Sequence, residues 1–227
     1  MIYQASPWHA YAEQSPHTPG PSPVARRMEW GTRPGSGPDA HVLGPALGSR
    51  RLLELGCGSG HNAAHLASVH GADVTAIDSV EIQIRRANEN YGSAQGLRFL
   101  TCDALRFLRG GAMPFDTIYS VFGAVGLIAP ERLLPAIARR LRAHGRLVFS
   151  VPHPRRRGRS TPPDGRPRQD FLALPDGTRR PLARWELDVA GWSATLHRVG
   201  FRPLGAWELP APGGEWPTSL VISSRRM

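Results

Sequence analysis

The chain has 227 residues, 41% of them hydrophobic and 20% charged, which is typical of one globular domain with room for a core. It contains no apolar run as long as a membrane span, no apolar core of a secretory signal, and only two cysteines, too few for a disulfide framework or a metal site. We therefore expect a cytoplasmic protein with no membrane partner and no bound metal ion.

The formal net charge is +10, and the positive charges come from arginine alone, because the sequence has no lysine. A strongly basic chain is often a nucleic-acid binder. Here the arginines are not interleaved with aromatic residues as in single-strand binders, and a GC-rich genome also favours arginine over lysine. The composition argues against nucleic acid as the main partner and leaves the oligomeric state open.

Residues 1–48 are rich in proline and glycine and are expected to be loop-like. Aromatic residues stand out within them, notably Trp8, Tyr11 and Trp30. We interpret the segment as an N-terminal lid or substrate segment that places these aromatic rings over a bound ligand, where they would suit a cation. Packing of the same rings on a sheet is the alternative.

Short apolar segments alternate with amphipathic ones from Arg51 onward. The expected strands are Arg51–Leu55, Asp73–Ile77, Leu97–Thr101, Phe115–Val121 and Arg146–Val151. The expected helices are His61–His70, Val80–Tyr91, Leu105–Leu108 and Pro130–Leu141. This alternation predicts a parallel sheet with helices on both faces.

Residues 154–184 contain nine arginines against three aspartates, are rich in proline and show no helical periodicity. We expect a long loop or flap inserted after the fifth strand, and long loops in compact domains are often functional. The elements expected beyond it are a short strand Arg184–Leu187, a helix Val189–Val199 capped by Asp188, and strands Phe201–Leu209 and Ser219–Ser223. Glycines between the last two strands favour an antiparallel hairpin.

Three glycines, Gly56, Gly58 and Gly60, join the first expected strand to the first expected helix. Glycine allows a sharp turn and the close approach of a ligand, so a strand that turns through glycines into a helix suits a nucleotide-like ligand. The spacing differs from the dinucleotide motif G-x-G-x-x-G, because His61 stands three residues after Gly58. A phosphate-binding P-loop is excluded because its lysine is missing.

Residues 54–60, with Glu54 followed by the three glycines, resemble the motif E/D-x-G-x-G-x-G of class I S-adenosylmethionine-dependent methyltransferases. The resemblance extends from Trp30 to the C-terminus. It implies an α/β fold, a Rossmann-like sandwich with a mostly parallel seven-stranded sheet, an antiparallel C-terminal hairpin and helices on both faces. Residues 49–227 would form this methyltransferase domain, with S-adenosylmethionine as the cofactor and S-adenosylhomocysteine as the product.

In an open parallel sheet, ligands bind beyond the carboxyl ends of the strands, which is where the candidate residues fall. By the resemblance, Asp78 would bind the ribose hydroxyls, Asp103 the adenine amino group, and Glu54 the glycine loop or, through water, the methionine amine. Alternatively, Asp78 and Asp103 only cap the helices that follow. The full predicted cofactor site is Glu54, Gly56, Cys57, Gly58, Gly60, Asn62, Asp78, Ser79, Cys102, Asp103, Ala104, Ser120, Tyr11 and Trp30.

Methyl transfer is an in-line displacement that depends mainly on positioning, and it needs a base only when the acceptor is a weak or protonated nucleophile. His153, directly after the fifth expected strand, is the candidate catalytic base. The alternative is a histidine held structurally in the turn Pro152-His153-Pro154.

The segments Tyr119–Ala124 and Phe149–Pro154 look like those of small actinobacterial-type methyltransferases of natural-product tailoring. We therefore expect methyl transfer to a small-molecule acceptor, such as a secondary metabolite or its precursor. Two alternatives stay open, an RNA or DNA methyltransferase that uses the arginine-rich flap and a non-catalytic S-adenosylmethionine-binding protein. Against the nucleic-acid alternative, the sequence lacks the [DNS]-P-P-[YF] motif of enzymes that methylate the amino groups of bases. Ser120-Val121-Phe122-Gly123 stands at that position, after the fourth expected strand.

Overall fold

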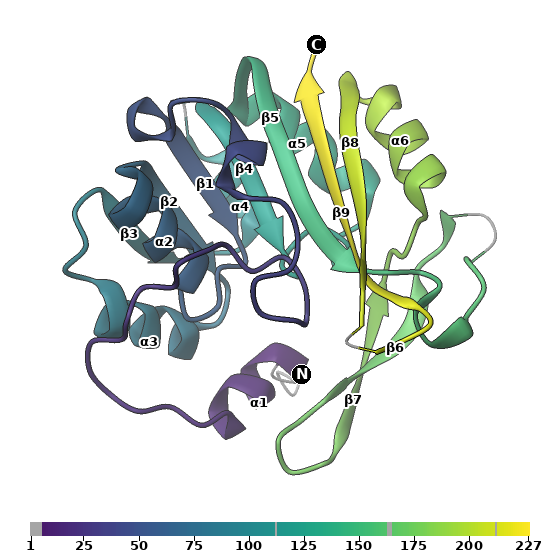
Figure 1. Cartoon of the computed structure of the whole chain (residues 1–227), viewed down its shortest axis with the longest axis horizontal. Helices are drawn as coiled ribbons and strands as arrows, with labels where there is room; N and C mark the ends of the chain where they lie inside the picture. Colours follow the sequence, from purple (N-terminus) through teal and green to yellow (C-terminus); the bar gives the residue numbers. More distant parts are fainter. Residues whose placement is uncertain (1–5, 112, 163–164, 212) are drawn as a thin grey trace.

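A computed structural model describes residues 6–111, 113–162, 165–211 and 213–227. Seven strands form one sheet in the order β3-β2-β1-β4-β5-β9-β8 (Figure 1). Their bounds are β1 Arg51–Leu55, β2 Asp73–Asp78, β3 Leu97–Thr101, β4 Phe115–Val121, β5 Leu141–Pro152, β8 Phe201–Pro210 and β9 Pro217–Arg226. The first five are parallel, whereas β9 runs antiparallel between β5 and β8. The predicted Rossmann-like fold with its antiparallel C-terminal hairpin is confirmed.

Helices cover both faces of this sheet, as the alternating pattern predicted. They are α2 His61–His70, α3 Glu81–Tyr91, α4 Ala104–Arg109, α5 Pro130–Arg140 and α6 Val189–Arg198. One buried cluster packs α4, α5 and α6 on one face, and a second packs α2, α3 and the N-terminal segment on the other. In the described residues no helix is long and apolar enough to cross a membrane.

The N-terminal segment is more ordered than its composition suggested. It contains the helix α1 Pro7–Gln14, whose first turn is capped by Ser6, and two short 3-10 turns at Ala40–Leu43 and Leu47–Ser49. Trp30 is fully buried in the second cluster beneath the sheet. The alternative that this ring packs in the core therefore holds for Trp30.

The arginine-rich flap is a β-hairpin over much of its length, which corrects the expected loop. Strands β6 Arg168–Ala173 and β7 Arg179–Arg184 pair antiparallel, and the expected short strand Arg184–Leu187 is wrong because β7 ends at Arg184. An Asp-Gly turn closes the hairpin, since Asp176 accepts from the Thr178 N–H at 2.8 Å. Arginine and proline on its outer positions obscured the period-two pattern in the sequence.

Both added elements lie beyond the carboxyl ends of the parallel strands. Figure 1 shows α1 below the ends of the central strands and the β6–β7 hairpin beside it. Helix α1 contacts α3, β6 and β7, and the Gln14 side chain accepts from the Asp176 N–H at 3.2 Å. The edge of the sheet where ligands are expected is thereby covered by two segments far apart in sequence.

Candidate functional site

A cavity of about 560 Å³ lies between the carboxyl ends of the parallel strands and the covering elements. Nine of the residues that the sequence predicted for the cofactor site line this cavity, eight from the strand ends and Tyr11 from α1. These nine are Gly56, Cys57, Gly58, Asp78, Ser79, Cys102, Asp103, Ala104 and Tyr11. The structure therefore brings residues from three successive strand ends into one concave site of a size suited to a small organic ligand.

The glycine run makes the floor of this cavity by adopting left-handed backbone. Gly56, Gly58 and Gly60 have φ of +76°, +54° and +85°. A Cβ on Gly56 would lie 2.7 Å from the Gly123 Cα, so two backbones cross here without room for a side chain. A Cβ on Gly58 would meet nothing within 4 Å, because this glycine borders the cavity itself.

Asp78 at the end of β2 lines the cavity and accepts from two backbone N–H groups. Its Oδ1 accepts from the Val80 N–H and its Oδ2 from the Gly58 N–H, both at 2.9 Å. Burial raises the pKa of this carboxyl, while these N–H groups oppose the shift. The carboxylate thus holds the glycine run and the residue before α3, and a carboxylate oxygen with one hydrogen bond can accept another.

Asp103 at the end of β3 likewise lines the cavity and caps a helix. Its Oδ1 accepts from the Arg106 N–H at 2.9 Å, which fixes the start of α4. Cys102 and Ala104 line the cavity on either side of it, and Gln83 faces them from α3. This end of the cavity presents a carboxylate next to apolar atoms, which suits a flat heterocycle with an amino group.

Glu54 lies underneath the glycine run and does not line the cavity. Its side chain is buried and accepts from the Tyr119 hydroxyl at 3.0 Å. Burial in this apolar setting raises the pKa of Glu54 to about 8, and the nearby Asp78 carboxylate adds to the shift. The hydrogen-bond partner of this carboxyl is thus Tyr119 of β4, and both roles that the sequence predicted for Glu54 stay predictions.

Four further predicted cofactor residues, Gly60, Asn62, Ser120 and Trp30, also lie outside the cavity lining. The Asn62 amide pairs with the backbone of Glu29, accepting from its N–H at 2.9 Å and donating to its carbonyl at 3.2 Å. The Ser120 hydroxyl donates to the Leu55 carbonyl at 2.8 Å. These polar groups satisfy buried backbone atoms instead of facing a ligand.

The turn after β4 points into the cavity through an unusual backbone. Phe122 has a φ of +49°, a conformation that non-glycine residues seldom adopt. The next residue, Gly123, has no room for a side chain, since a Cβ there would lie 2.2 Å from the Leu55 carbonyl oxygen. Strained backbone held by tight packing is common at binding sites, and here it aims residues 121–124 at the cavity.

The structure holds His153 in a turn outside the cavity lining. The side chain is buried, its Nδ1 accepts from the Arg155 N–H at 3.1 Å, and its Nε2 lies 3.3 Å from a Glu208 carboxylate oxygen. Burial lowers the pKa of this imidazole, and Glu208 partly offsets the shift. This geometry matches the structural alternative given for the residue.

Sequence reasoning missed the side of the cavity formed by the β4–α5 turn and the hairpin. Leu127 and Ile128 come from the turn, and Leu182, Ala183 and Trp185 come from β7 and the residue after it. Trp8 joins them from α1 and meets Tyr11 edge-on with ring centroids 6.0 Å apart. No local motif specifies the five residues of the turn and the hairpin, because only the tertiary fold brings them to the strand ends. Trp8, in contrast, was expected near the ligand from the sequence.

Comparisons with known proteins agree with this geometry. Residues 52–145 match the family model described as a methyltransferase domain. The O-methyltransferase cnsE of Penicillium expansum is 34% identical over 111 residues, which are 48% of this chain and 40% of that protein. The chain spans less than half the length of the curated relatives it matches. In the described residues no three His, Cys, Asp or Glu side chains are grouped to hold a metal ion.

Solved structures share the fold. A putative S-adenosylmethionine-dependent methyltransferase from Listeria monocytogenes superposes with a TM-score of 0.64 at 18% identity, covering 82% of this chain and 94% of that one. The 1,6-didemethyltoxoflavin-N1-methyltransferase of Burkholderia thailandensis, solved with its substrate and S-adenosylhomocysteine bound, gives a TM-score of 0.57 at 24% identity, covering 78% and 71%.

Proposed function

We propose that the protein transfers a methyl group from S-adenosylmethionine to a small-molecule acceptor by in-line displacement, on the premise that residues 52–145, which match the methyltransferase-domain model, form such a domain. The observation that carries the proposal is the meeting of Gly58, Asp78 and Asp103 in one cavity. They come from three successive strand ends of a parallel sheet, where this fold binds its ligands.

The lining indicates how each residue would hold the donor. Asp78 would accept from the ribose hydroxyls, and Asp103 with Ala104 would bind the adenine. The backbone of the glycine run and of residues 122–124 would surround the methionine part. When bound, the donor supplies a methyl group on a sulfonium, which is already a good leaving group. The protein has to align the acceptor with that methyl and exclude water.

We also propose that the N-terminal segment acts as the lid of this site. Helix α1 places Trp8 and Tyr11 in the cavity wall, and aromatic faces suit a sulfonium cation. The hairpin within residues 154–184 forms the other part of the cover. In this division residues 1–48 and the flap surround the ligands, and the remainder of 49–227 is the methyltransferase domain.

The acceptor that we propose is a small metabolite, in line with relatives named as O-methyltransferases and a structural neighbour that methylates 1,6-didemethyltoxoflavin. The two cysteines are not paired in a disulfide, and Cys57 is buried. This fits the proposal that the protein works in the reducing cytoplasm.

Donor binding is the test of the proposed function. Asp78→Asn should weaken S-adenosylmethionine binding by about tenfold or more in calorimetry, because a buried hydrogen-bonding carboxylate is lost. Asp73→Asn, at the other end of β2, is the matched control and should bind normally. Equal affinity of both variants would remove Asp78 from the site, and no binding to the unaltered protein would overturn the function.

A further inference from the structure

The side of the cavity opposite the donor residues is a wall of apolar side chains. We call it the apolar wall, and it consists of Pro7, Trp8, Leu127, Ile128, Leu182 and Trp185. Its two indole rings come from different covering elements, Trp8 from α1 and Trp185 from the residue after β7. An acceptor that fits here has a flat, apolar body, because such surfaces bind by burying area and by ring stacking.

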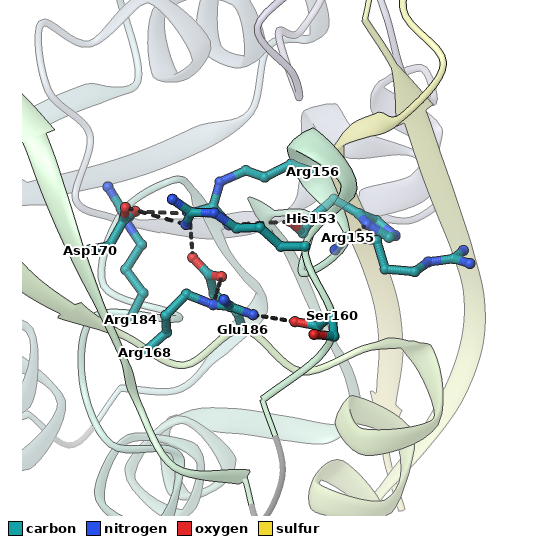
Figure 2. Close-up of polar contacts among 9 residues, drawn as sticks. His153, Arg155, Arg156, Ser160, Arg168, Asp170, Arg184 and Glu186 are labelled. Atoms are coloured by element: carbon teal, nitrogen blue, oxygen red, sulfur yellow. Dashed lines mark hydrogen bonds and ion pairs between the residues drawn. The ribbon is translucent and has the colours of Figure 1, made fainter.

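A cluster of charged side chains includes Arg184 and Glu186, the residues on either side of the wall residue Trp185 (Figure 2). We call it the arginine cluster, and its members are Arg156, Arg159, Arg168, Arg184, Asp170 and Glu186. It ties the hairpin to the segment that follows β5. Within the described residues four guanidinium groups face two carboxylates, so the cluster has an excess of positive charge.

The pairing inside the arginine cluster is close. Arg156 Nη2 lies 2.8 Å from Asp170 Oδ2 and 2.6 Å from Glu186 Oε1, and Arg168 Nε lies 2.9 Å from Glu186 Oε2. Arg184 Nε donates to Asp170 Oδ2 at 3.0 Å. Glu186 is fully buried, so the cluster lies in a setting where charges act over longer distances than in water.

Arg184 connects the cluster to the cavity. Its neighbours in sequence, Ala183 and Trp185, both line the cavity, and the Arg184 side chain is 11% exposed. The guanidinium carbon lies 5.8 Å from the centroid of the Trp8 ring. A guanidinium of the arginine cluster therefore lies next to the apolar wall at Trp8, on the side where an acceptor would bind.

We propose that the acceptor is a planar apolar molecule that reacts as an oxygen anion, an acidic phenol or enol, and that the arginine cluster favours its ionised form. This rests on the proposed function and assigns the acceptor class of the same site. The acceptor loses its proton to solvent before transfer. Its oxygen then donates a lone pair to the methyl carbon, and the carbon–sulfur bond breaks with its electron pair left on sulfur. An anion and a cation become a neutral methyl ether and a neutral thioether.

The other charged groups around the cavity are compatible with this role. Asp78 and Asp103 are on the donor side, where the sulfonium offsets them. His61 Nε2 faces the Glu29 carboxylate at 3.6 Å, and Arg155 pairs with Glu208 at 3.3 Å. His153 points at Glu208 rather than at the apolar wall. Arg106, Arg109 and Arg132 share a neighbouring pocket with Leu127, Ile128 and Trp185, so they add positive charge on another side of the wall. The arginine cluster approaches the wall at Trp8, through Arg184.

The acceptor class is tested with probes of graded acidity. The unaltered protein, shown first by calorimetry to bind S-adenosylmethionine, is assayed for S-adenosylhomocysteine formation with 4-nitrophenol, 7-hydroxy-4-methylcoumarin, 4-methylphenol, benzyl alcohol and benzylamine. We expect rates at neutral pH to follow phenol acidity, and the rate of each phenol to rise with pH with a midpoint about one unit below its pKa in water. Turnover of the alcohol or the amine at phenol-like rates, or of no phenol by a donor-binding protein, would overturn the proposal. Failure to bind the donor would instead count against the proposed function.

Charge removal tests the role of the cluster with the same phenols. Arg184→Gln should raise the pH midpoint by about one unit, and Arg159→Gln, a more exposed member that is safer for folding, should raise it by less. Arg180→Gln, an exposed arginine on the same strand β7, should leave the midpoint unchanged. A purely structural cluster would change stability without moving the midpoint. Unmoved midpoints in both cluster variants, or an equal movement in Arg180→Gln, would refute the role of the cluster.

Discussion

The two sides of the cavity are built in different ways. The donor side comes from consecutive strand ends, where the backbone of Gly56 and Gly58 and the carboxylates of Asp78 and Asp103 are fixed by the register of a parallel sheet. The acceptor side comes from α1 and the β6–β7 hairpin, two segments far apart in sequence that meet only in the folded chain. The proposed donor site thus lies on a rigid sheet edge. The covering elements, α1 and the hairpin, can vary in sequence without disturbing that edge.

The contacts that hold each side reflect this difference. The donor side is held by backbone hydrogen bonds and by close backbone contacts that leave no room for a side chain. The contact between Gly56 and Gly123 is an example. On the acceptor side, the hairpin has its own backbone ladder, and the Trp185 N–H donates to the Gly126 carbonyl at 2.9 Å. Side-chain ion pairs and a hydrogen bond from the Asp176 N–H to the Gln14 side chain add to these contacts. Three changes test how separate the two sides are, and they are given from the largest expected effect to the smallest.

Gly56→Ala should abolish donor binding. The added Cβ would lie 2.7 Å from the Gly123 Cα at a φ of +76°, so the crossing of two backbones under the cavity must open. We expect a loss of about a hundredfold or more in affinity for S-adenosylmethionine by calorimetry. Gly71→Ala, at a φ of +66° with its nearest neighbour 3.9 Å away, is the control and should cost only stability. Normal donor binding by Gly56→Ala would show that the donor side is not rigid.

Glu54→Gln should change how stability depends on pH. The pKa of Glu54 in the folded protein is about 8, against an ordinary value of 4.5, so folding favours the neutral carboxyl. Its contribution is fully present below pH 4.5 and is lost as pH rises towards 8. The melting temperature of the unaltered protein should therefore fall by several degrees over this window, and that of Glu54→Gln should fall less. Parallel melting curves for the two proteins would contradict the shift.

His153→Ala should have the smallest effect on catalysis. Because the imidazole is buried in a turn against Glu208 and outside the cavity lining, its loss should lower stability by about 1–3 kcal/mol in denaturant unfolding. Turnover and donor affinity, measured well below the melting temperature, should each stay within a factor of about three. A large loss of turnover with normal stability and donor affinity would restore the histidine as the catalytic base.

The fold was predictable because its signals are local. The expected helix His61–His70 and strands Arg51–Leu55, Leu97–Thr101 and Phe115–Val121 have the predicted bounds. Strand β5 begins earlier than expected, because Leu141 had been assigned to the preceding helix and His144-Gly145 to a turn. Strand β9 runs longer because its end carries polar residues and two arginines, which do not resemble a buried strand. Helix α1 and the hairpin were missed because their stability comes from packing against one another rather than from strong local propensity.

The sequence by itself determined the donor side. Glycines that must adopt left-handed backbone and carboxylates at strand ends are read directly from neighbouring residues, and the sheet register then brings them together. Only the tertiary structure decided the acceptor side. Trp8 and Trp185 belong to one wall because α1 and β7 pack together. Three other predicted residues lie outside the cavity lining because their side chains contact other groups: Asn62 and Ser120 contact backbone atoms, and His153 contacts the Glu208 carboxylate. Such partners come from distant parts of the chain, and no local pattern specifies them.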